Sequence, residues 1–425
     1  MYARAMTWRD QTAFLWHAPK LLFRPLQLAL NFPAPLFLAT LLVLLFRPCD
    51  LDLHNIDRIA FCLLCVFVSL RALALLQRLP FIARLSLPML ALVALAVLRV
   101  AREPFDVRIW SMVAGKFIVP FVLFHLAMLV FRGRAEQRQF EWFVVVTLAY
   151  LTFTAVAFLV DARALVFPRF ILDESVGIHA DRARGPFLQA VANGLSLNLL
   201  GLLAFTVSGN VKRRMVWVLW FALPWAILAT MTRSVWIGFA ASTIAVAIRL
   251  SKWPVGKTCF MISLASLIVL ATGLSTSSLR TAIFERSEER GPVQARMAVY
   301  EAGWSMIRER PLTGWPPTSM YRELARRMPG YRLNEFYVHN TYLSLLLEFG
   351  WPGLALYGFI FFHLFRLSKA PISPESYFVS RLRSMWPWLL CVFLFNAFFV
   401  DMVYQFVIGL LFTVAGILCS SAEAA

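Results

Sequence analysis

The chain has 425 residues, of which 60% are hydrophobic and only 15% are charged, and its formal net charge is +18. An ordinary soluble domain is about half apolar and a quarter charged, so this composition excludes a typical soluble fold. The apolar residues gather in blocks close to the roughly 20 residues that span a bilayer as a helix, with basic residues between the blocks. We therefore expect a membrane protein that contacts anionic lipid, and no nucleic-acid partner.

In chain order, the apolar blocks predict about twelve membrane-spanning helices, so the expected fold class is an all-α transmembrane bundle. The blocks lie at 29–46, 59–77, 85–98, 111–131, 143–160, 186–208, 215–232, 234–249, 258–275, 340–366, 385–400 and 403–420. They divide the chain into helices one to nine in 1–275, a long loop at 276–339 and helices ten to twelve in 340–425. Apolar residues at helical spacing in 295–307 predict that the loop folds as a cap of short helices.

The basic residues of the loops alternate in a way that predicts the orientation of the chain. The N-terminal segment and every second loop are basic, including Arg78 and Arg84 in the second loop and Lys212 in the sixth. Such loops remain in the cytoplasm, so both termini are expected there. The intervening loops are mixed in sign or acidic and are expected outside. The long loop at 276–339 is expected outside as well, since loops of that length cross largely regardless of charge.

Three polar features share the outer side under this topology. Arg184 lies just before the sixth span, Arg233 lies in the short turn between spans seven and eight, and His339 and Asn340 open the tenth. Histidine has an unperturbed pKa close to neutrality, so His339 can take and return a proton. Arginine bonds two phosphate oxygens at once. Together these residues predict a site for a hydroxyl to be deprotonated and a phosphate-bearing leaving group.

Each of these residues also has an explanation without chemistry. Arg233 at a span end can extend to the lipid headgroups, as can Lys116 in the fourth span. Arg184 lies in a charged loop, and Asn340 or Thr341 can act as a helix N-cap. No nucleotide-binding or zinc-protease motif is present and no cysteine or histidine cluster has metal-ligand spacing, so no cofactor or metal is expected.

The combination of motifs resembles the O-antigen ligase and polymerase superfamily. The turn at 232–238 reads T-R-S-x-W-x-G, and the segment from His339 reads H-N-x-x-L-x-x-x-x-E-x-G. The loop stretch from Arg296 to Trp315 is also similar to the loop of that family. The family often has Asn-Pro-Asn near the start of the sixth span, where this chain keeps Asn193 without the proline.

The resemblance implies a bacterial inner-membrane glycosyltransferase of the GT-C class. Its donor would be a glycan on undecaprenyl pyrophosphate, and its acceptor a sugar hydroxyl of lipid A–core or of another carrier-linked glycan. The transfer would be inverting and independent of metal. His339 would be the catalytic base, Arg233 and Arg184 would hold the pyrophosphate, and Arg296 and Asn340 would bind substrate at the periplasmic face.

Three functions remain open at this point. The leading one is a ligase that transfers glycan to lipid A–core, and the first alternative is a repeat-unit polymerase for O-antigen, capsule or exopolysaccharide. The second alternative is a transporter of lipid-linked glycan. Transporter sites usually lie near the middle of the membrane, whereas the polar residues here gather on one face, which favours chemistry at the interface.

Overall fold

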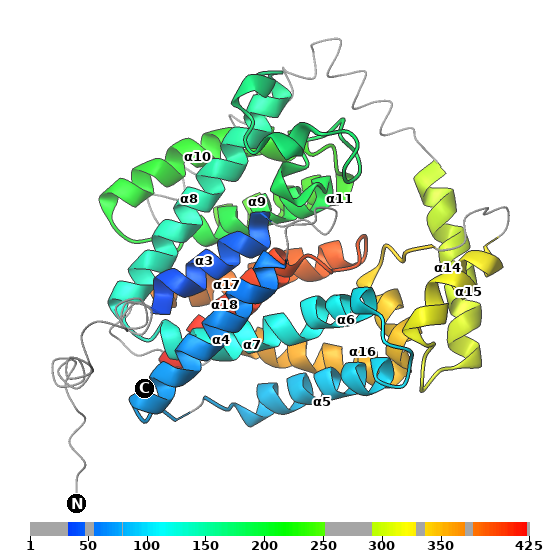
Figure 1. The fold of residues 1–425 in the computed structure, drawn as a ribbon. Coiled ribbons are helices and arrows are strands. Elements are labelled where there is room, and N and C mark those ends of the chain that lie inside the picture. The colour runs from blue at the N-terminus through cyan, green and yellow to red at the C-terminus, as the bar shows by residue number, and fades with distance from the viewer. Residues whose placement is uncertain are drawn as a thin grey trace, which may run out of the picture.

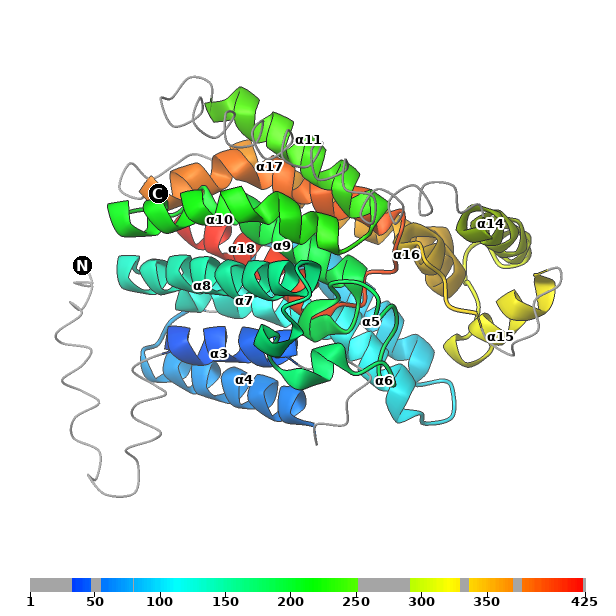
Figure 2. The ribbon, with the colours of Figure 1, turned by 90° about the horizontal axis from the view of Figure 1, so that it is seen from above.

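The computed structural model describes residues 33–46, 55–78, 80–250, 291–328, 336–369 and 377–422. Within these ranges the chain is helical and has no strand, which agrees with the expected all-α class. The long helices run side by side, and two further helices cap one end of the bundle (Figures 1 and 2).

The helices of the bundle and cap are α3 (Pro33–Phe46), α4 (Ile56–Ala74), α5 (Ala83–Val100), α6 (Val107–Val113), α7 (Val119–Val130), α8 (Arg134–Leu159), α9 (Ala190–Ala204), α10 (Asn210–Ala229), α11 (Arg233–Leu250), α14 (Gly291–Glu309), α15 (Pro317–Arg327), α16 (Thr341–Arg366), α17 (Tyr377–Ala397) and α18 (Gln405–Ala422). Shorter elements are the π-helical turn η1 (Ala114–Ile118) and the 3₁₀ turns η2 (Arg163–Leu165), η3 (Arg169–Leu172), η4 (Gly185–Phe187) and η5 (Leu367–Lys369).

Every predicted apolar block except 258–275, which lies outside the described residues, coincides with a helix. Helices long and apolar enough to cross a membrane are Ala83–Val100, Val107–Val130, Arg134–Leu159, Thr341–Arg366 and Tyr377–Ala397. Shorter apolar helices are Pro33–Phe46, Ala190–Ala204 and Gln405–Ser420. The described part of the chain therefore supports a multi-pass membrane protein with 5 candidate spans. The expected total of about twelve stays a prediction.

The centre of the bundle is the contact between α7 and α18, the most extensive in the structure. A Cβ added to Gly416 of α18 would lie 2.4 Å from the backbone oxygen of Phe124 in α7, so only glycine permits this approach. Close approach through small residues is a common way for membrane helices to pack, because lipid provides little hydrophobic drive. The rings of Phe121 and Phe412 add an edge contact at 5.0 Å. The helix α17 packs against α18, and Phe361 of α16 contacts the Phe412 ring at a centroid distance of 6.3 Å.

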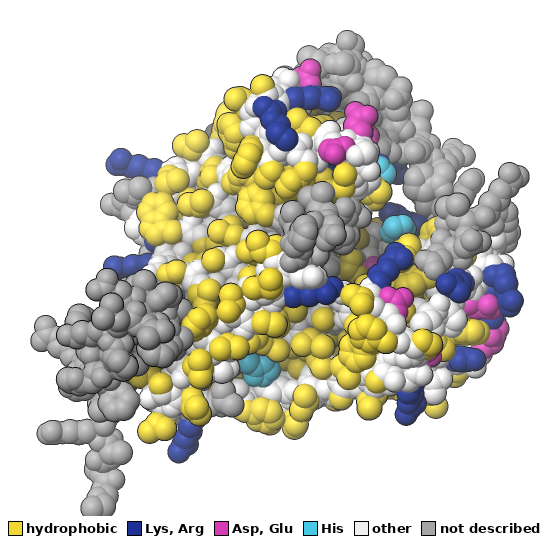
Figure 3. Space-filling model, viewed as in Figure 1, with side chains coloured by type: hydrophobic (Ala, Val, Ile, Leu, Met, Phe, Trp, Pro, Cys, Tyr) yellow, Lys and Arg dark blue, Asp and Glu magenta, His cyan; other side chains and the backbone are white. Residues whose placement is uncertain are grey.

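The flank of the bundle is mostly hydrophobic, whereas charged side chains concentrate toward its ends (Figure 3). Exposed apolar residues on this flank include Leu63, Val66, Leu70 and Leu73 of α4 and Leu87, Leu90 and Leu98 of α5. Apolar patches of this extent on a folded protein mark a surface that is covered by another apolar phase, here lipid.

The cap is joined to α16 by an exchange of backbone hydrogen bonds at a kink. Gly350 has a φ of 66°, outside the helical range, and the chain there turns sharply. The N–H of Trp351 donates to Pro311 of the cap at 2.8 Å, and the carbonyl of Leu347 accepts from Trp315 at 2.7 Å. Cap residues thus replace the helical partners that the kink removes. The described part of the predicted cap is helical, as expected, while 276–290 and 329–335 lie outside the described residues.

Candidate active site

The three predicted polar features lie at the same end of the bundle. The N–H of Ala183 donates to the carbonyl of Ala229 at 2.9 Å, which joins the Arg184 loop to the turn before α11. A Cβ on Gly238 of α11 would lie 3.2 Å from the Asn396 amide, so α11 packs closely against the end of α17. The loop after α17 in turn contacts the start of α16, which His339 precedes. The structure therefore gathers segments that are more than 150 residues apart in sequence, as the difference between 339 and 183 shows.

Asn340 is the N-cap of α16. Its side-chain oxygen accepts hydrogen bonds from the N–H groups of Tyr342 at 2.9 Å and Leu343 at 3.0 Å. Its amide nitrogen donates to the Tyr300 hydroxyl of α14 at 3.3 Å. The predicted capping role is thus present, and it fixes the backbone directly after His339. Substrate binding by Asn340 stays a prediction.

His339 is exposed at the mouth of this region, with the ring of Phe336 at a centroid distance of 5.9 Å. The pKa of His339 is lowered, first because the surrounding protein displaces water and second because of the positive charge of Arg296. Both effects disfavour the protonated imidazole. The side chain is therefore neutral at neutral pH and has a nitrogen lone pair available to accept a proton.

Arg296 is half-buried on α14, and its guanidinium carbon lies 5.7 Å from the centre of the Phe399 ring. A guanidinium over an aromatic face is held by a cation–π contact while its N–H edges stay available. Arg296 also lies close enough to His339 for the two side chains to interact electrostatically.

Arg233 is the first residue of α11, and its side chain is exposed. Among the described residues it has no hydrogen bond or ion pair, and its planar guanidinium carries five N–H donors. The adjacent Trp236 indole donates to the Ile227 carbonyl at 3.1 Å, which holds the α10–α11 turn in place. The N-terminus of a helix also favours an anion. Arg233 is thus placed where a phosphate group can reach it.

Arg184 has a different environment, since only 1% of its surface is exposed. Its Nε donates to the carbonyl of Ile171 at 2.9 Å, and its Nη1 donates to that of Val176 at 2.6 Å. Its Nη2 donates to the Asp173 carbonyl. The guanidinium therefore holds the loop between α8 and α9 in its observed form. This arrangement favours a role in folding, and contact of Arg184 with pyrophosphate stays a prediction.

Asn193 supports the same loop, because its amide nitrogen donates to the Ala183 carbonyl at 2.8 Å. A Cβ added to Gly185, which has a φ of +56°, would lie 2.6 Å from the Asn193 oxygen. The asparagine that remains from the family motif thus fixes the loop that contains Arg184.

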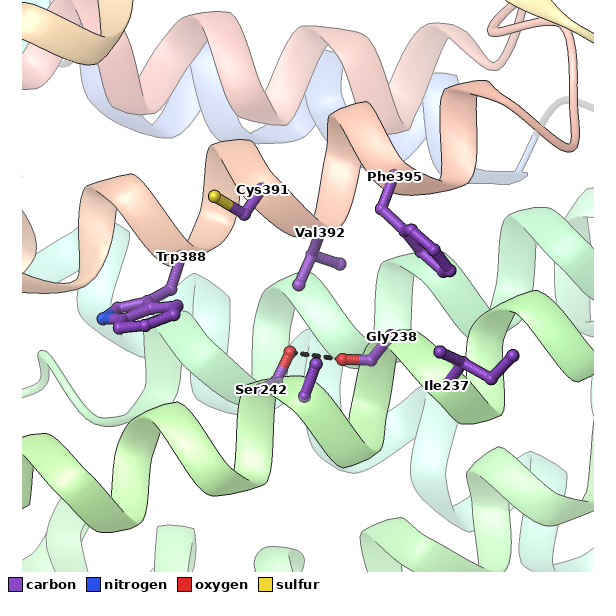
Figure 4. Close-up of a pocket in the computed structure, with 8 residues that line it drawn as sticks. Ile237, Gly238, Ser242, Trp388, Cys391, Val392 and Phe395 are labelled. Atoms are coloured by element: carbon purple, nitrogen blue, oxygen red, sulfur yellow. Dashed lines mark hydrogen bonds between the residues drawn. The ribbon is translucent and has the colours of Figure 1, made fainter.

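An apolar groove lies between α11 and α17, with a volume of about 230 Å³ (Figure 4). Its lining residues are Ile237, Gly238, Ala241, Ser242, Trp388, Cys391, Val392 and Phe395. The Ser242 hydroxyl donates to the Gly238 carbonyl at 2.8 Å and so presents little polarity to the groove. Ile237 and Ala241 follow Arg233 at intervals of four residues, so they share one face of α11. This face of α11 therefore carries Arg233 at its N-terminal end and apolar side chains along the following two turns.

Lys116 does not extend to the lipid headgroups, so the expectation from the sequence is wrong for this residue. The side chain is buried, with 8% of its surface exposed, and it pairs with Glu348 and Asp401. A charged residue inside a predicted span was the available signal, because such residues usually have a partner inside the protein. The partners could not be identified because they lie more than 200 residues away in sequence, as 348 minus 116 shows.

Within the part of the chain that the structure describes, no three His, Cys, Asp or Glu side chains are grouped so as to hold a metal ion. Residues 217–358 match the protein family described as O-antigen ligase. That range contains Arg233, Arg296, His339 and Asn340, but it begins at residue 217 and so does not include Arg184. The search of curated proteins found no match to the chain. Over residues 217–358, the family match confirms the resemblance to the O-antigen ligase and polymerase superfamily.

Proposed function

We propose that the protein is an O-antigen ligase-type glycosyltransferase of the bacterial inner membrane. It moves a glycan from undecaprenyl pyrophosphate to a sugar hydroxyl of lipid A–core at the periplasmic face. The observation that carries the proposal is that the family match spans both Arg233 and His339, whose helices begin at the same end of the bundle. The match itself supports an O-antigen ligase or a related polymerase.

In the proposed reaction, neutral His339 accepts the proton of the acceptor hydroxyl while the hydroxyl oxygen attacks the anomeric carbon of the donor sugar. The bond from that carbon to the pyrophosphate oxygen breaks, and its electron pair leaves with the pyrophosphate. Attack opposite the leaving group inverts the anomeric configuration. A positioned base contributes about 10²- to 10⁴-fold to such a step.

The arginines supply the positive charge that this scheme requires, and no metal is part of it. Arg233 has no described partner and can bond two phosphate oxygens with its planar fork. Arg296, held over Phe399, is a second cation, and its charge acts on His339. In this scheme Arg184 stabilises the loop between α8 and α9. Asn340 caps the N-terminus of α16, directly after His339.

The groove between α11 and α17 supports the choice of a lipid-linked donor. An isoprenoid chain placed along Ile237 and Ala241 would bring its pyrophosphate to Arg233, on the same helix face. This placement agrees with about twelve spans, cytoplasmic termini and a periplasmic cap, as the alternation of basic loops predicts.

The experiment that tests the proposal uses purified protein, carrier-linked glycan and two acceptors in separate reactions. Glycan joined to lipid A–core supports the ligase. Lengthening of carrier-linked glycan, with no transfer to lipid A–core, supports the polymerase alternative. Movement of the lipid-linked glycan across vesicles without any new linkage contradicts both enzymes and supports the transporter.

A further inference from the structure

A buried charged cluster lies beneath the first turns of α16. The Lys116 ammonium lies 3.0 Å from Glu348 Oε1, 3.1 Å from Asp401 Oδ1 and 3.0 Å from the Ser344 hydroxyl. The Ser344 hydroxyl in turn lies 2.7 Å from Glu348 Oε1 and 3.0 Å from Asp401 Oδ2. We call these four residues the charged anchor. They join three separate parts of the chain at one point.

The backbone around Lys116 is shaped to bring its side chain into this position. Lys116 lies in the π-helical turn η1, between α6 and α7. Such turns are rare, and they shift the side chains that follow onto a different helix face. A Cβ on Gly115 would lie 2.5 Å from the Gln405 amide nitrogen, so the glycine lets η1 approach the start of α18. Burying an ammonium group is costly without partners, and the two carboxylates supply them.

The charged anchor connects the segment after His339 to the loop between α17 and α18. In the first turn of α16, the Thr341 hydroxyl donates to the Val400 carbonyl at 2.9 Å and accepts from the Met402 N–H at 3.0 Å. The Tyr342 hydroxyl donates to the Leu394 carbonyl at 2.8 Å. The start of α16 is thus fixed to that loop by Thr341 and to the last turns of α17 by Tyr342.

The same loop carries Phe399, the ring on which the Arg296 guanidinium rests. His339 precedes α16, and Arg296 approaches from α14. The loop therefore contacts both the start of α16 and the side chain of Arg296. The lowered pKa of His339 has two causes, the water displaced by the surrounding protein and the charge of Arg296, and neither is the charge of the anchor.

We propose that Lys116, Ser344, Glu348 and Asp401 are positioning residues that hold His339 in register with Arg296. This inference rests on the proposed function, in which the histidine and the arginine act on the same substrate. A misplacement of about 1 Å in such a site costs about 10²-fold in rate.

The charged anchor can also take up a proton. Lys116 carries one positive charge against two carboxylates, and the Ser344 hydroxyl proton serves only one carboxylate at a time. Burial and the nearby Glu348 raise the pKa of Asp401 to about 6, against the opposing effect of Lys116. Tyr321 of α15 and Tyr357 of α16 also interact with the Asp401 charge.

Because the pKa of Asp401 is raised, its protonation begins at a higher pH than for an ordinary aspartate, and protonation weakens its ion pair with Lys116. Asp401→Asn imitates the protonated carboxyl at every pH while keeping the shape of the side chain. In this variant we expect a lower kcat at neutral pH. We also expect the fall of kcat at low pH to follow the protonation of His339 alone.

The test compares Lys116→Met and Asp401→Asn with a matched control, Lys212→Met. Lys212 forms a buried ion pair with Glu141. The two residues belong to the first turns of α10 and α8, and these helix ends lie away from the cap (Figure 2). Removing either lysine leaves a buried carboxylate, so both lysine variants lose thermal stability. We expect only the anchor variants to lower kcat, by about 10- to 100-fold, with a donor KM within about twofold of wild type.

Hydrogen exchange of 336–344 and 398–404, followed by mass spectrometry, gives a readout that does not need activity. We expect faster exchange of both segments in Lys116→Met and Asp401→Asn, and wild-type exchange in Lys212→Met. Unchanged exchange and unchanged kcat in the anchor variants would overturn the inference, as would an equal loss of kcat in Lys212→Met. Wild-type protein that transfers no glycan contradicts the proposed function, and the exchange measurement then still decides whether the charged anchor positions the start of α16.

Discussion

The hydrogen bonds of Arg184 lead to a quantitative prediction for the loop between α8 and α9. Arg184→Met retains an unbranched side chain but removes the donors to the carbonyls of Ile171, Asp173 and Val176. A hydrogen bond with a charged partner contributes about 1.5–3 kcal/mol, so three contribute about 4.5–9 kcal/mol if they add. The carbonyls regain water when the loop opens, which limits the loss to the free energy of local opening. We expect a local destabilisation of about 4 kcal/mol, near the lower end of that range.

Hydrogen exchange of residues 161–189 measures this effect directly. A change of about 4 kcal/mol corresponds to a roughly thousandfold shift in the opening equilibrium, and exchange of the protected amides should accelerate accordingly. The matched control is Arg163→Met in the same loop, because Arg163 is exposed and pairs with Asp161 at the surface. That variant should exchange like wild type. Wild-type protection in Arg184→Met, together with lost transfer, would show that this guanidinium acts on substrate and would refute the loop-holding role.

Three further predictions concern residues around His339. Arg296→Gln removes a positive charge, so the pKa of His339 should rise and the acid limb of kcat/KM against pH should move to higher pH; an unmoved limb contradicts the interaction. Arg233→Lys keeps the charge but loses the fork, so kcat/KM should fall about tenfold with unchanged thermal stability, whereas a fully active Arg233→Ala protein would remove this residue from the mechanism. Asn340→Ala should lower the free energy of unfolding by about 1 kcal/mol, measured by denaturation, and a variant as stable as wild type would mean that the cap contributes little.

The positions of the helices could be predicted from the sequence because each one carries a block of apolar residues. The tenth block was predicted to begin at residue 340, and α16 begins at Thr341. The start of α8 was less predictable, since the block at 143–160 begins nine residues after Arg134, as 143 minus 134 shows. The first turns of α8, which the predicted block leaves out, are polar in sequence. Glu141 in these turns is buried because Lys212 of α10 pairs with it.

The residue types of the candidate site could be predicted from the sequence, but the groups that each side chain contacts could not. Asn340 could be expected to cap α16 because capping depends on neighbours two and three residues away. The environment of Arg184 could not be predicted, because its acceptors are backbone carbonyls that every residue has. Lys116 was misjudged for a related reason, since an ammonium in a span can extend to water or pair inside the protein, and only the fold determines which.

The central claim is that His339 is the base that deprotonates the acceptor hydroxyl. The most direct measurement is the rate of glycan transfer by purified His339→Asn protein, with carrier-linked glycan and acceptor, compared with the rate of the wild type. The thermal stability of both proteins is measured alongside and should be equal. Because the His339 side chain is exposed and the helix cap belongs to Asn340, the substitution should leave the fold intact. The account predicts a loss of about 10²- to 10⁴-fold in kcat. Transfer at the wild-type rate by a folded His339→Asn protein would contradict it.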